Sequence, residues 1–368
     1  MQIDQHVDAI IGLQFGDEGK GKICAGVSSQ INYELTARYN GGPNAGHTIV
    51  IDNSKTLKLH QLPSSIAYEK PGHIGPGTVI DFNKLQIEIS HFQEVMGFDP
   101  LKYLTISPKA IVVSSTHIKL DACYHAGFQG STSSGIAPAY SSFYDRKANL
   151  ASSYSFPCNA NIETIEEISS VSTLLLEGAQ GHWLNPYQGN YPYTTSSSSH
   201  PASAAVTFGF PSNKIRNVIG VAKCYETRSG IDDNFDLVLN YFDKLIEPSS
   251  SNQVNNVYDK IQNYGSEIGV TTGRKRKVRF LDVNRLVKAI NSTGTNILVI
   301  NKWDILEGLA LSLKDDSPYS YYLNGDLFYA DPNMKDHVTE YLNEMCPSLD
   351  YIIHSSSPLN DIDWSLYL

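Results

Sequence analysis

Five short runs of mostly apolar, often β-branched residues restrict the fold more than any other feature of this sequence. Continuous apolar runs of this kind suit strands that are buried on both faces, as in a parallel sheet covered by helices. Segments with a helical spacing of apolar residues lie between them. The alternation predicts an α/β fold with a mainly parallel central sheet flanked by helices. The expected strands are residues 7–15, 172–178, 217–226, 295–304 and 350–356.

Two segments show the helical spacing most clearly. In residues 279–294 four apolar residues fall near one face and Gly294 is placed to end the helix, and residues 334–345 show a similar spacing. The Ser-rich stretch 194–205 is either a flexible linker or an ordered, hydroxyl-rich binding turn, and two neighbouring aromatic residues favour the turn. Because no convincing boundary is visible, we expect a single domain spanning residues 1–368.

The composition argues against several classes of protein. The 368 residues carry a formal net charge of -10, which disfavours binding of nucleic acid through bulk charge. The sequence shows neither an apolar run long enough for a membrane span nor the pattern of a signal peptide. Its five cysteines are scattered and include no C-x-x-C pair, which indicates reduced thiols. We therefore expect a cytoplasmic protein with neither a nucleic-acid nor a membrane partner.

The first expected strand runs into a glycine-rich loop, GLQFGDEGKGKI, at residues 12–23. It matches the G-x-x-x-x-G-K part of a phosphate loop, but Ile23 stands where that pattern has Ser or Thr. Glycines let backbone N–H groups approach phosphate oxygens, and lysines supply positive charge. The alternative is a tight strand-to-helix turn with surface lysines, which three glycines in six residues disfavour as the whole explanation. The carboxylates of Asp17 and Glu18 suit a magnesium ligand or a proton acceptor.

Three further loops carry polar groups. The Gly-rich segment 41–47 ends in His47, which suits proton transfer or stabilisation of a charged oxygen, although a structural histidine is the alternative. Residues 130–140, with Arg146 just beyond, fit a phosphate site and a common surface loop equally well. Gln180 follows an apolar run, where its amide either binds a base or caps the structure.

Two motifs in the second half point to anionic and guanine ligands. Residues 269–280 contain five basic side chains, and in an acidic protein such a cluster suggests a small anionic substrate bound by arginine forks. Nuclear targeting or nucleic-acid binding is the alternative for a basic run. Lys302 and Asp304 complete an N-K-x-D pattern after a strand. An aspartate there accepts hydrogen bonds from two N–H groups of guanine that adenine does not offer, which indicates GTP.

Taken together and in this order, these motifs are similar to those of the adenylosuccinate synthetase family. The similar segments are GLQFGDEGKGKI, GGPNAGHT, GIAPAY, EGAQG, YPYTTSSSS, TTGRKR, NKWD and HSSSPLND. The resemblance implies the P-loop-like fold of that family and a ligase of purine biosynthesis that forms a C–N bond. Such an enzyme condenses IMP with L-aspartate, driven by GTP hydrolysis, with Mg²⁺ as cofactor. A homodimer is also implied.

The resemblance further implies a role for individual residues. Asp17 would accept the N1 proton of IMP and bind magnesium together with the Gly46 carbonyl, and His47 would act as an acid on the transferring phosphoryl group. The implied catalytic residues are Asp17, Lys20, His47 and Gln180. The implied phosphate loop comprises Gly16, Glu18, Gly19, Lys20, Gly21 and Lys22. The purine monophosphate would meet Asn44, Thr132, Arg146, Gln180, Thr195 and Arg274, with Arg146 reaching the neighbouring subunit's site. L-Aspartate would meet Thr271, Thr272, Arg274 and Arg276. Guanine would be bound by Lys302, Asp304, Ser355 and Ser357.

Departures from the family pattern leave alternatives open. In size the chain resembles compact archaeal forms and phage enzymes that use dGMP. An STSSG stretch replaces the usual T-G-R-G, and Ser229 and Ser357 occupy positions where other small residues are common. Asp17 and Asp304 favour IMP and GTP over dGMP and ATP. A dGMP-using ligase, with ATP as a candidate donor, is the alternative. A non-catalytic GTP-binding module is a third hypothesis, but it would need neither His47 nor the basic loop.

Overall fold

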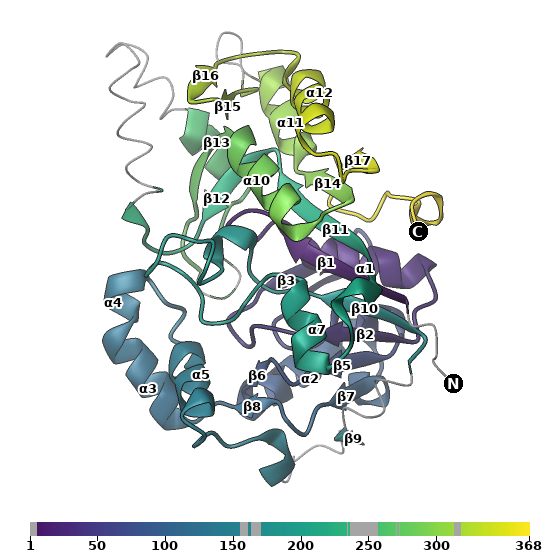
Figure 1. Cartoon of the computed structure of the whole chain (residues 1–368), viewed down its shortest axis with the longest axis vertical. Coiled ribbons are helices and arrows are strands. Elements are labelled where there is room, and N and C mark those ends of the chain that lie inside the picture. Colours follow the sequence, from purple (N-terminus) through teal and green to yellow (C-terminus); the bar gives the residue numbers. More distant parts are fainter. Residues whose placement is uncertain are drawn as a thin grey trace.

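The computed structural model describes residues 6–154, 161–162, 171–233, 235, 257–269, 271, 273–312 and 318–368. Its centre is a nine-stranded sheet in which every neighbouring pair of strands is parallel (Figure 1). This confirms the predicted α/β fold. In spatial order the strands are β17 (Tyr351–His354), β14 (Ile297–Asn301), β11 (Ile215–Lys223), β1 (His6–Gly12), β10 (Thr173–Glu177), β2 (Leu35–Arg38), β5 (Gly72–Ile74), β7 (Leu104–Ile106) and β9 (Asn161–Ile162).

Smaller sheets and the helices surround this central sheet. A four-stranded sheet lies at the upper end in Figure 1, near α10 and α12, and α3, α4 and α5 lie at the lower left. The strands of the smaller sheets are β12 (Tyr225–Arg228), β13 (Lys277–Asp282), β15 (Tyr321–Leu323) and β16 (Asp326–Phe328), with the pairs β3 (His47–Val50) and β4 (Thr56–Leu59), and β6 (Val79–Ile80) and β8 (Ile111–Val112). The helices are α1 (Lys20–Gln30), α2 (Phe82–Met96), α3 (Ser115–Tyr124), α4 (Ala126–Gln129), α5 (Ile136–Tyr144), α7 (Ala202–Phe208), α10 (Val283–Thr293), α11 (Trp303–Ser312) and α12 (Met334–Met345).

Helices cover both faces of the sheet. Successive strand residues point to opposite faces, so a continuous apolar strand packs against helices on both sides. Leu175 of β10 packs in one cluster with Ile23 of α1. Its neighbours Leu174 and Leu176 pack in another cluster with Phe208 of α7. All these side chains are buried, and full burial of each contributes about 1.5–3 kcal/mol of hydrophobic free energy. This two-sided burial explains why the strands appear in the sequence as continuous apolar runs.

The position of β1 fixes where a ligand can bind. The first strand of the chain lies in the middle of the sheet, between β10 and β11. Strands β10, β2, β5, β7 and β9 lie on one side of β1, and the later strands β11, β14 and β17 lie on the other. In open α/β sheets, ligands bind beyond the carboxyl ends of the strands where the strand order reverses. The glycine-rich loop leaves the carboxyl end of β1 and therefore lies at this reversal.

The structure confirms most of the expected elements and corrects the bounds of several. Each of the five expected segments contributes a strand to the central sheet, and residues 334–345 form α12. The first of these strands ends at Gly12, and β14 ends at Asn301 because α11 begins at Trp303. The helix expected at 279–294 begins only at Val283, because residues 279–282 belong to β13, and it ends at Gly294 as expected. The strand expected at 217–226 breaks at Cys224, where the chain passes from β11 into the second sheet as β12.

The Ser-rich stretch is ordered, as expected, but it ends in a helix. The Thr195 N–H donates to the Leu184 carbonyl at 2.8 Å, and the Ser199 hydroxyl donates to the Gly181 carbonyl at 3.0 Å. From Ala202 the chain continues as α7, so residues 202–205 are helical. These bonds hold the stretch against the loop that follows β10.

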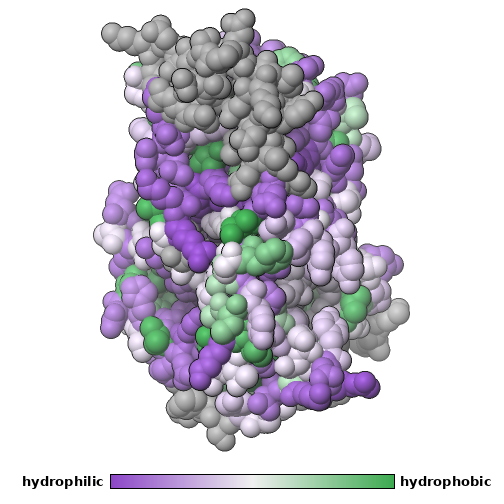
Figure 2. All heavy atoms as spheres, turned by 90° about the vertical axis from the view of Figure 1, so that its left-hand side faces the viewer, coloured by the Kyte–Doolittle hydropathy of each residue, from purple (hydrophilic) through white to green (hydrophobic). Residues whose placement is uncertain are grey.

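The cysteines, the helices and one face of the surface bear on the expectations from composition. Cys24, Cys123, Cys224 and Cys346 form no disulfide, and Cys158 lies outside the described residues. None of the helices described is long and apolar enough to cross a bilayer. On the face seen in Figure 2, hydrophilic side chains predominate and hydrophobic ones form small, separate patches.

Candidate active site

The loop between β1 and α1 has the backbone of an anion-binding turn. Gly16, Asp17 and Gly19 adopt left-handed conformations with φ of 87°, 61° and 99°. Glycine adopts these angles without strain, and aspartate tolerates them better than most residues. Left-handed residues in a turn form a concave backbone surface for anions, and the N-terminus of α1 adds a partial positive charge.

Glu18 organises this loop from within. Its carboxylate is buried and accepts hydrogen bonds from the N–H groups of Gln14 at 3.1 Å and Gly16 at 2.9 Å. The Lys20 ammonium forms an ion pair with the same carboxylate at 2.6 Å. A Cβ atom at Gly12 or Gly181 would clash with the Glu18 side chain. One of the two carboxylates of the loop is therefore a structural acceptor, held where glycines leave room for it.

A cavity of about 770 Å³ lies over the loop and gathers most of the predicted site residues. Its lining includes Gly16, Asp17, Glu18, Gly19, Lys20, Gly21, Lys22, Asn44, Gly46, His47, Thr132, Gln180, Thr195, Arg276, Lys302, Asp304 and Ser357. Arg146, Thr271, Arg274 and Ser355 do not line it, and Thr272 lies outside the described residues.

His47 is oriented by a buried carboxylate. Its Nδ1 lies 2.5 Å from Glu177 Oε1, and Glu177 also accepts from the Ser64 N–H at 2.8 Å and the Ser64 hydroxyl at 2.6 Å. His47 Nε2 is buried and has no hydrogen-bond partner among the described residues. Since His47 lines the cavity, its ring nitrogen Nε2 is available to a ligand there.

The protonation of this pair follows from its surroundings. Burial and the nearby Arg38 charge lower the pKa of His47, against the attraction of Glu177. Burial raises the pKa of Glu177, but His47, Arg38 and the Ser64 hydroxyl outweigh it and bring that pKa down to about 2. Glu177 is therefore ionised, and the imidazole donates a hydrogen bond from Nδ1–H to this carboxylate. A phosphoryl anion near Nε2 favours a second proton on the ring.

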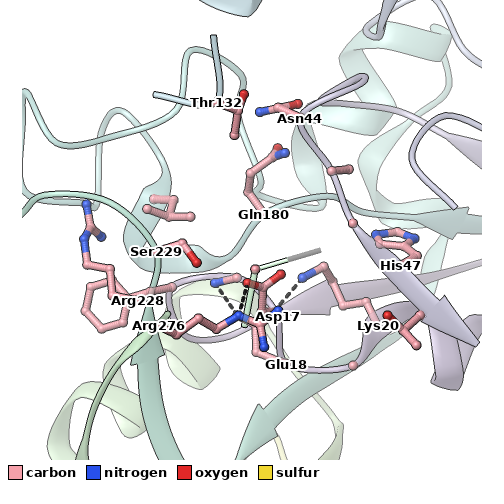
Figure 3. A pocket seen from close by; sticks show the side chains of 18 of the residues that line it. Asp17, Glu18, Lys20, Asn44, His47, Thr132, Gln180, Arg228, Ser229 and Arg276 are labelled. Carbon is pink, nitrogen blue, oxygen red and sulfur yellow. Dashed lines mark hydrogen bonds and ion pairs between the residues drawn. The ribbon is translucent and has the colours of Figure 1, made fainter. Parts of the chain in front are cut away.

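Asp17 belongs to a network of charged groups. Its Oδ2 accepts from Arg276 Nε at 2.7 Å (Figure 3). Arg276 Nη1 contacts Glu267 Oε2 at 2.6 Å. Glu267 also faces the buried Lys223 ammonium at 3.4 Å. Burial lowers the pKa of Arg276, but Asp17 and Glu267 outweigh it, so that pKa is raised. The guanidinium predicted to bind L-aspartate thus reaches the carboxylate predicted to act as base.

Buried polar atoms without partners among the described residues lie on the side of the cavity that is predicted to bind the purine monophosphate. Figure 3 shows Gln180 extending toward Asn44 and Thr132. Gln180 Oε1 and Asn44 Oδ1 are buried and lack a hydrogen-bond partner in the described part of the chain. Buried polar groups are nearly always paired, so these two atoms indicate a polar ligand. The Thr132 loop is held by Asp121, which accepts from the Ser131 hydroxyl and the Gly135 N–H at 2.7 Å each.

Arg276 of the basic loop lines the cavity, whereas Thr271 and Arg274 contact segments beside it. Arg274 Nη1 donates to the Gly130 carbonyl at 2.9 Å. The Thr271 hydroxyl donates to the Ala45 carbonyl at 3.3 Å, beside the segment that carries His47. Thr271 and Arg274 thus lie at the border of the predicted purine site.

Arg146 stands apart from these groups. It is an exposed residue just after α5 with a φ of 61°, and it does not line the cavity of its own chain. This placement leaves open the predicted contact with a neighbouring subunit.

Comparison with known proteins identifies the family. The sequence model described as adenylosuccinate synthetase matches residues 9–155 and 151–340. The chain belongs to this family. The adenylosuccinate synthetase of Flavobacterium johnsoniae is 33% identical over 86% of this chain and 82% of its own length. That of Thermoplasma volcanium is 34% identical over 86% of this chain and 79% of its own. The family comprises ligases that form a C–N bond in purine biosynthesis, which confirms the predicted enzyme class.

Two solved structures share the fold. A fully ligated adenylosuccinate synthetase from Plasmodium falciparum superposes with a TM-score of 0.74 at 22% identity, covering 97% of this chain and 98% of the other. A succinoaminodeoxyadenylate synthetase from cyanophage S-2L, bound to dGMP and dATP, has a TM-score of 0.70 at 17% identity, covering 97% and 94%. The family fold is therefore shared by enzymes named for different products.

The residues present fit the magnesium ion that the family implies. Among the described residues no three His, Cys, Asp or Glu side chains are grouped to hold a metal ion by themselves. Magnesium, however, is usually bound through one or two carboxylates together with substrate phosphates and waters. Asp17 and Gly46 both line the cavity beside the phosphate loop, so a carboxylate and a carbonyl oxygen are provided where phosphates would lie.

Several residues that the structure places at or beside the cavity were not predicted from the sequence. Glu177 is the last residue of β10, and a carboxylate ending an apolar strand was the available signal. Ser64 and Glu267 carried no such signal, because their partners are distant in sequence. Arg228 lines the cavity and donates to the Tyr193 carbonyl at 2.6 Å.

Proposed function

We propose that this enzyme condenses IMP with L-aspartate, driven by hydrolysis of GTP, to give adenylosuccinate. The observation that carries the proposal is the grouping of Asp17, His47 and Gln180 on one cavity with the base-reading pair Lys302 and Asp304. The glycine-rich loop that is predicted to hold phosphate lines the same cavity. A non-catalytic GTP-binding module would need neither a histidine aligned by a buried carboxylate nor the basic loop beside it.

In the proposed mechanism the residues of this chain move one proton and orient two substrates. Asp17 accepts the N1 proton of IMP as the purine O6 attacks the γ-phosphoryl group of GTP, and GDP leaves. The amine of L-aspartate then attacks C6, and inorganic phosphate leaves with the O6 oxygen. His47 Nε2 and Lys20 donate to the phosphoryl oxygens, where charge is spread in the transition state. Gln180 orients the purine.

Magnesium would be held by Asp17 and the Gly46 carbonyl. When bound it would neutralise charge on the phosphates. Arg274, Arg276, Thr271 and Thr272 would hold the carboxylates of L-aspartate. Asn44, Thr132 and Thr195 would hold the purine monophosphate, and Ser355 and Ser357 would help to bind guanine.

Arg146 would complete the monophosphate site of a second subunit in a homodimer. This assignment is supported by its exposure and by the fact that it does not line the cavity of its own chain. We also propose a single domain and a cytoplasmic location.

The second candidate is a ligase that uses dGMP. It is favoured by the shared fold with the cyanophage enzyme, whose structure contains dGMP and dATP. The two candidates differ in the acceptor and donor nucleotides but share the phosphoryl transfer and the amine attack.

A phosphate-release assay separates the candidates. L-Aspartate and Mg²⁺ are kept constant while IMP and dGMP are crossed with GTP and ATP, and the product is identified by mass. The proposal expects the highest kcat/KM with IMP and GTP. Preference for dGMP would replace it by the second candidate. Asp17→Ala is expected to abolish turnover while GDP still binds, because the proton acceptor is lost. Undiminished synthesis by this variant would remove Asp17 from the mechanism.

A further inference from the structure

The side chain of the second lysine in the glycine-rich loop contacts a turn near the C-terminus of the chain. Lys22 lies in the first turn of α1, and only 11% of its side chain is exposed. Its Nζ donates to the Ser355 hydroxyl at 2.6 Å and to the Ser357 carbonyl at 2.5 Å. Lys20, by contrast, pairs with Glu18 inside the loop. The two lysines of the GKGK sequence thus serve different ends of the cavity.

The turn that Lys22 contacts lies beside the proposed guanine-binding segment. It follows β17, which pairs with β14 so that His354 lies opposite Ile300. The Ser355 N–H donates to the Ile300 carbonyl at 3.0 Å. Lys302 and Asp304 come directly after β14. Backbone bonds therefore set the start of the turn, and the Lys22 ammonium holds its far side at Ser357.

Charged groups around the ammonium fit this position. Asp361 Oδ1 lies 3.9 Å from Lys22 Nζ and accepts from the Ser355 hydroxyl at 3.3 Å. Burial lowers the pKa of Lys22, whereas Asp361 and Asp304 oppose that effect and Lys302 adds to it. The ammonium is thus enclosed by the turn and by the residues that follow β14. Without it, the Ser357 carbonyl would lose this partner at the edge of the cavity.

We propose that Lys22 is a positioning residue for base recognition: it holds the Ser355–Ser357 turn so that the donor site accepts a guanine nucleotide in preference to an adenine nucleotide. This inference rests on the proposed role of GTP as donor. A site that discriminates bases by hydrogen bonds does so only while its polar groups keep their places, because a misplaced group leaves a buried donor or acceptor unpaired. Lys22, Lys302, Asp304 and Ser357 all line the same cavity.

The test compares GDP and ADP binding by calorimetry in wild type, Lys22→Met and Lys119→Met. Met keeps the apolar stem of lysine and removes the ammonium. Lys119 is an exposed lysine of α3 outside the cavity lining and serves as the control. Lys22→Met is expected to weaken GDP binding about 10- to 100-fold while ADP binding changes less than about threefold, as loss of hydrogen bonds to a charged donor predicts. Lys119→Met is expected to match wild type.

The other outcomes would contradict either the inference about Lys22 or the assignment of GTP as donor. Equal weakening of GDP and ADP would place Lys22 on the phosphates and overturn the inference, as would unchanged binding of both. If wild type binds GDP no better than ADP, the donor assignment under the proposed function fails as well. Should Lys22→Met not fold, Asp361→Asn, which removes the charge 3.9 Å from the Lys22 ammonium, decides the matter. It is expected to lower the GDP preference severalfold, and an unaltered preference would overturn the inference.

Discussion

Replacing Glu177 by glutamine tests whether the buried carboxylate works through His47. Glu177→Gln keeps the size of the side chain and removes its charge. The carboxylate now accepts three hydrogen bonds, one from His47 Nδ1 at 2.5 Å and two from Ser64. A glutamine has one acceptor oxygen and an NH₂ group, so one of these donors would face another donor. The imidazole would lose the anion that favours a proton on both ring nitrogens.

The size of the effect follows from the bond that is lost. A hydrogen bond to a charged group contributes about 1.5–3 kcal/mol net. Because roughly 1.4 kcal/mol corresponds to a factor of ten in rate, kcat should fall about 10- to 150-fold. Glu177 does not line the cavity, so the KM values for the nucleotides should change little.

The assay is steady-state phosphate release with saturating substrates, accompanied by thermal melting. Glu88→Gln is a matched control, because Glu88 is also buried and accepts backbone N–H groups from residues 60–62 but does not contact His47. It should lower stability with little change in kcat. A Glu177→Gln enzyme that melts like wild type and keeps kcat within twofold would refute the reasoning.

Three more predictions concern the base site, the acceptor site and acid stability. Asp304→Asn should lower the GTP-over-ATP ratio of kcat/KM at least about tenfold, because the paired acceptor for guanine is lost; an unaltered ratio would remove Asp304 from base recognition. Arg274→Leu should raise the KM for L-aspartate about tenfold through loss of a charge-assisted contact, and unchanged KM and kcat would contradict its assignment. Burial lowers the pKa of His73, His182 and His354 from 6.5 to about 4, so the unfolded chain binds more protons between these values. The free energy of unfolding should therefore fall as the pH drops from 6.5 to 4, by about 3 kcal/mol for the nearly fully buried His73 alone. Chemical denaturation at several pH values checks this, and a constant unfolding free energy across that range would contradict it.

The fold could be predicted from the sequence because strands that are buried on both faces have apolar residues at consecutive positions. Runs such as 172–178 and 295–304 are visible without knowledge of their neighbours. Strands β2, β5 and β7 were not predicted, since they contain only three or four residues and pairing rather than composition makes them strands. Residues 279–282 misled the helix prediction because Phe280 and Leu281 fit both periodicities, and pairing with β12 and β15 decided for the strand.

Around the cavity, local sequence accounts best for the conformation of the loop after β1. Glycine adopts left-handed conformations easily, and Gly16 and Gly19 of the loop after β1 have them. The role of Glu18 was hidden, because the N–H groups that donate to its carboxylate reach it only when the loop folds back on itself. Glu177 and His47 are 130 residues apart, and their contact depends on the docking of β3 against the sheet. Contacts of this kind are set by tertiary packing, which a single sequence does not display.

The contacts of Lys22 also bear on the kinetics of folding. Its hydrogen bonds to Ser355 and Ser357 join residues 333 and 335 positions apart. Contacts at such separations require large loops to close and are made slowly. Since β1 pairs with β10 and β11, the phosphate loop also waits for strands that emerge from the ribosome much later. A nascent chain that ends before β17 would contain the glycine-rich loop but not the Ser355–Ser357 turn to which Lys22 donates hydrogen bonds. Nucleotide binding should therefore report late folding of the whole sheet rather than early folding of its N-terminal half.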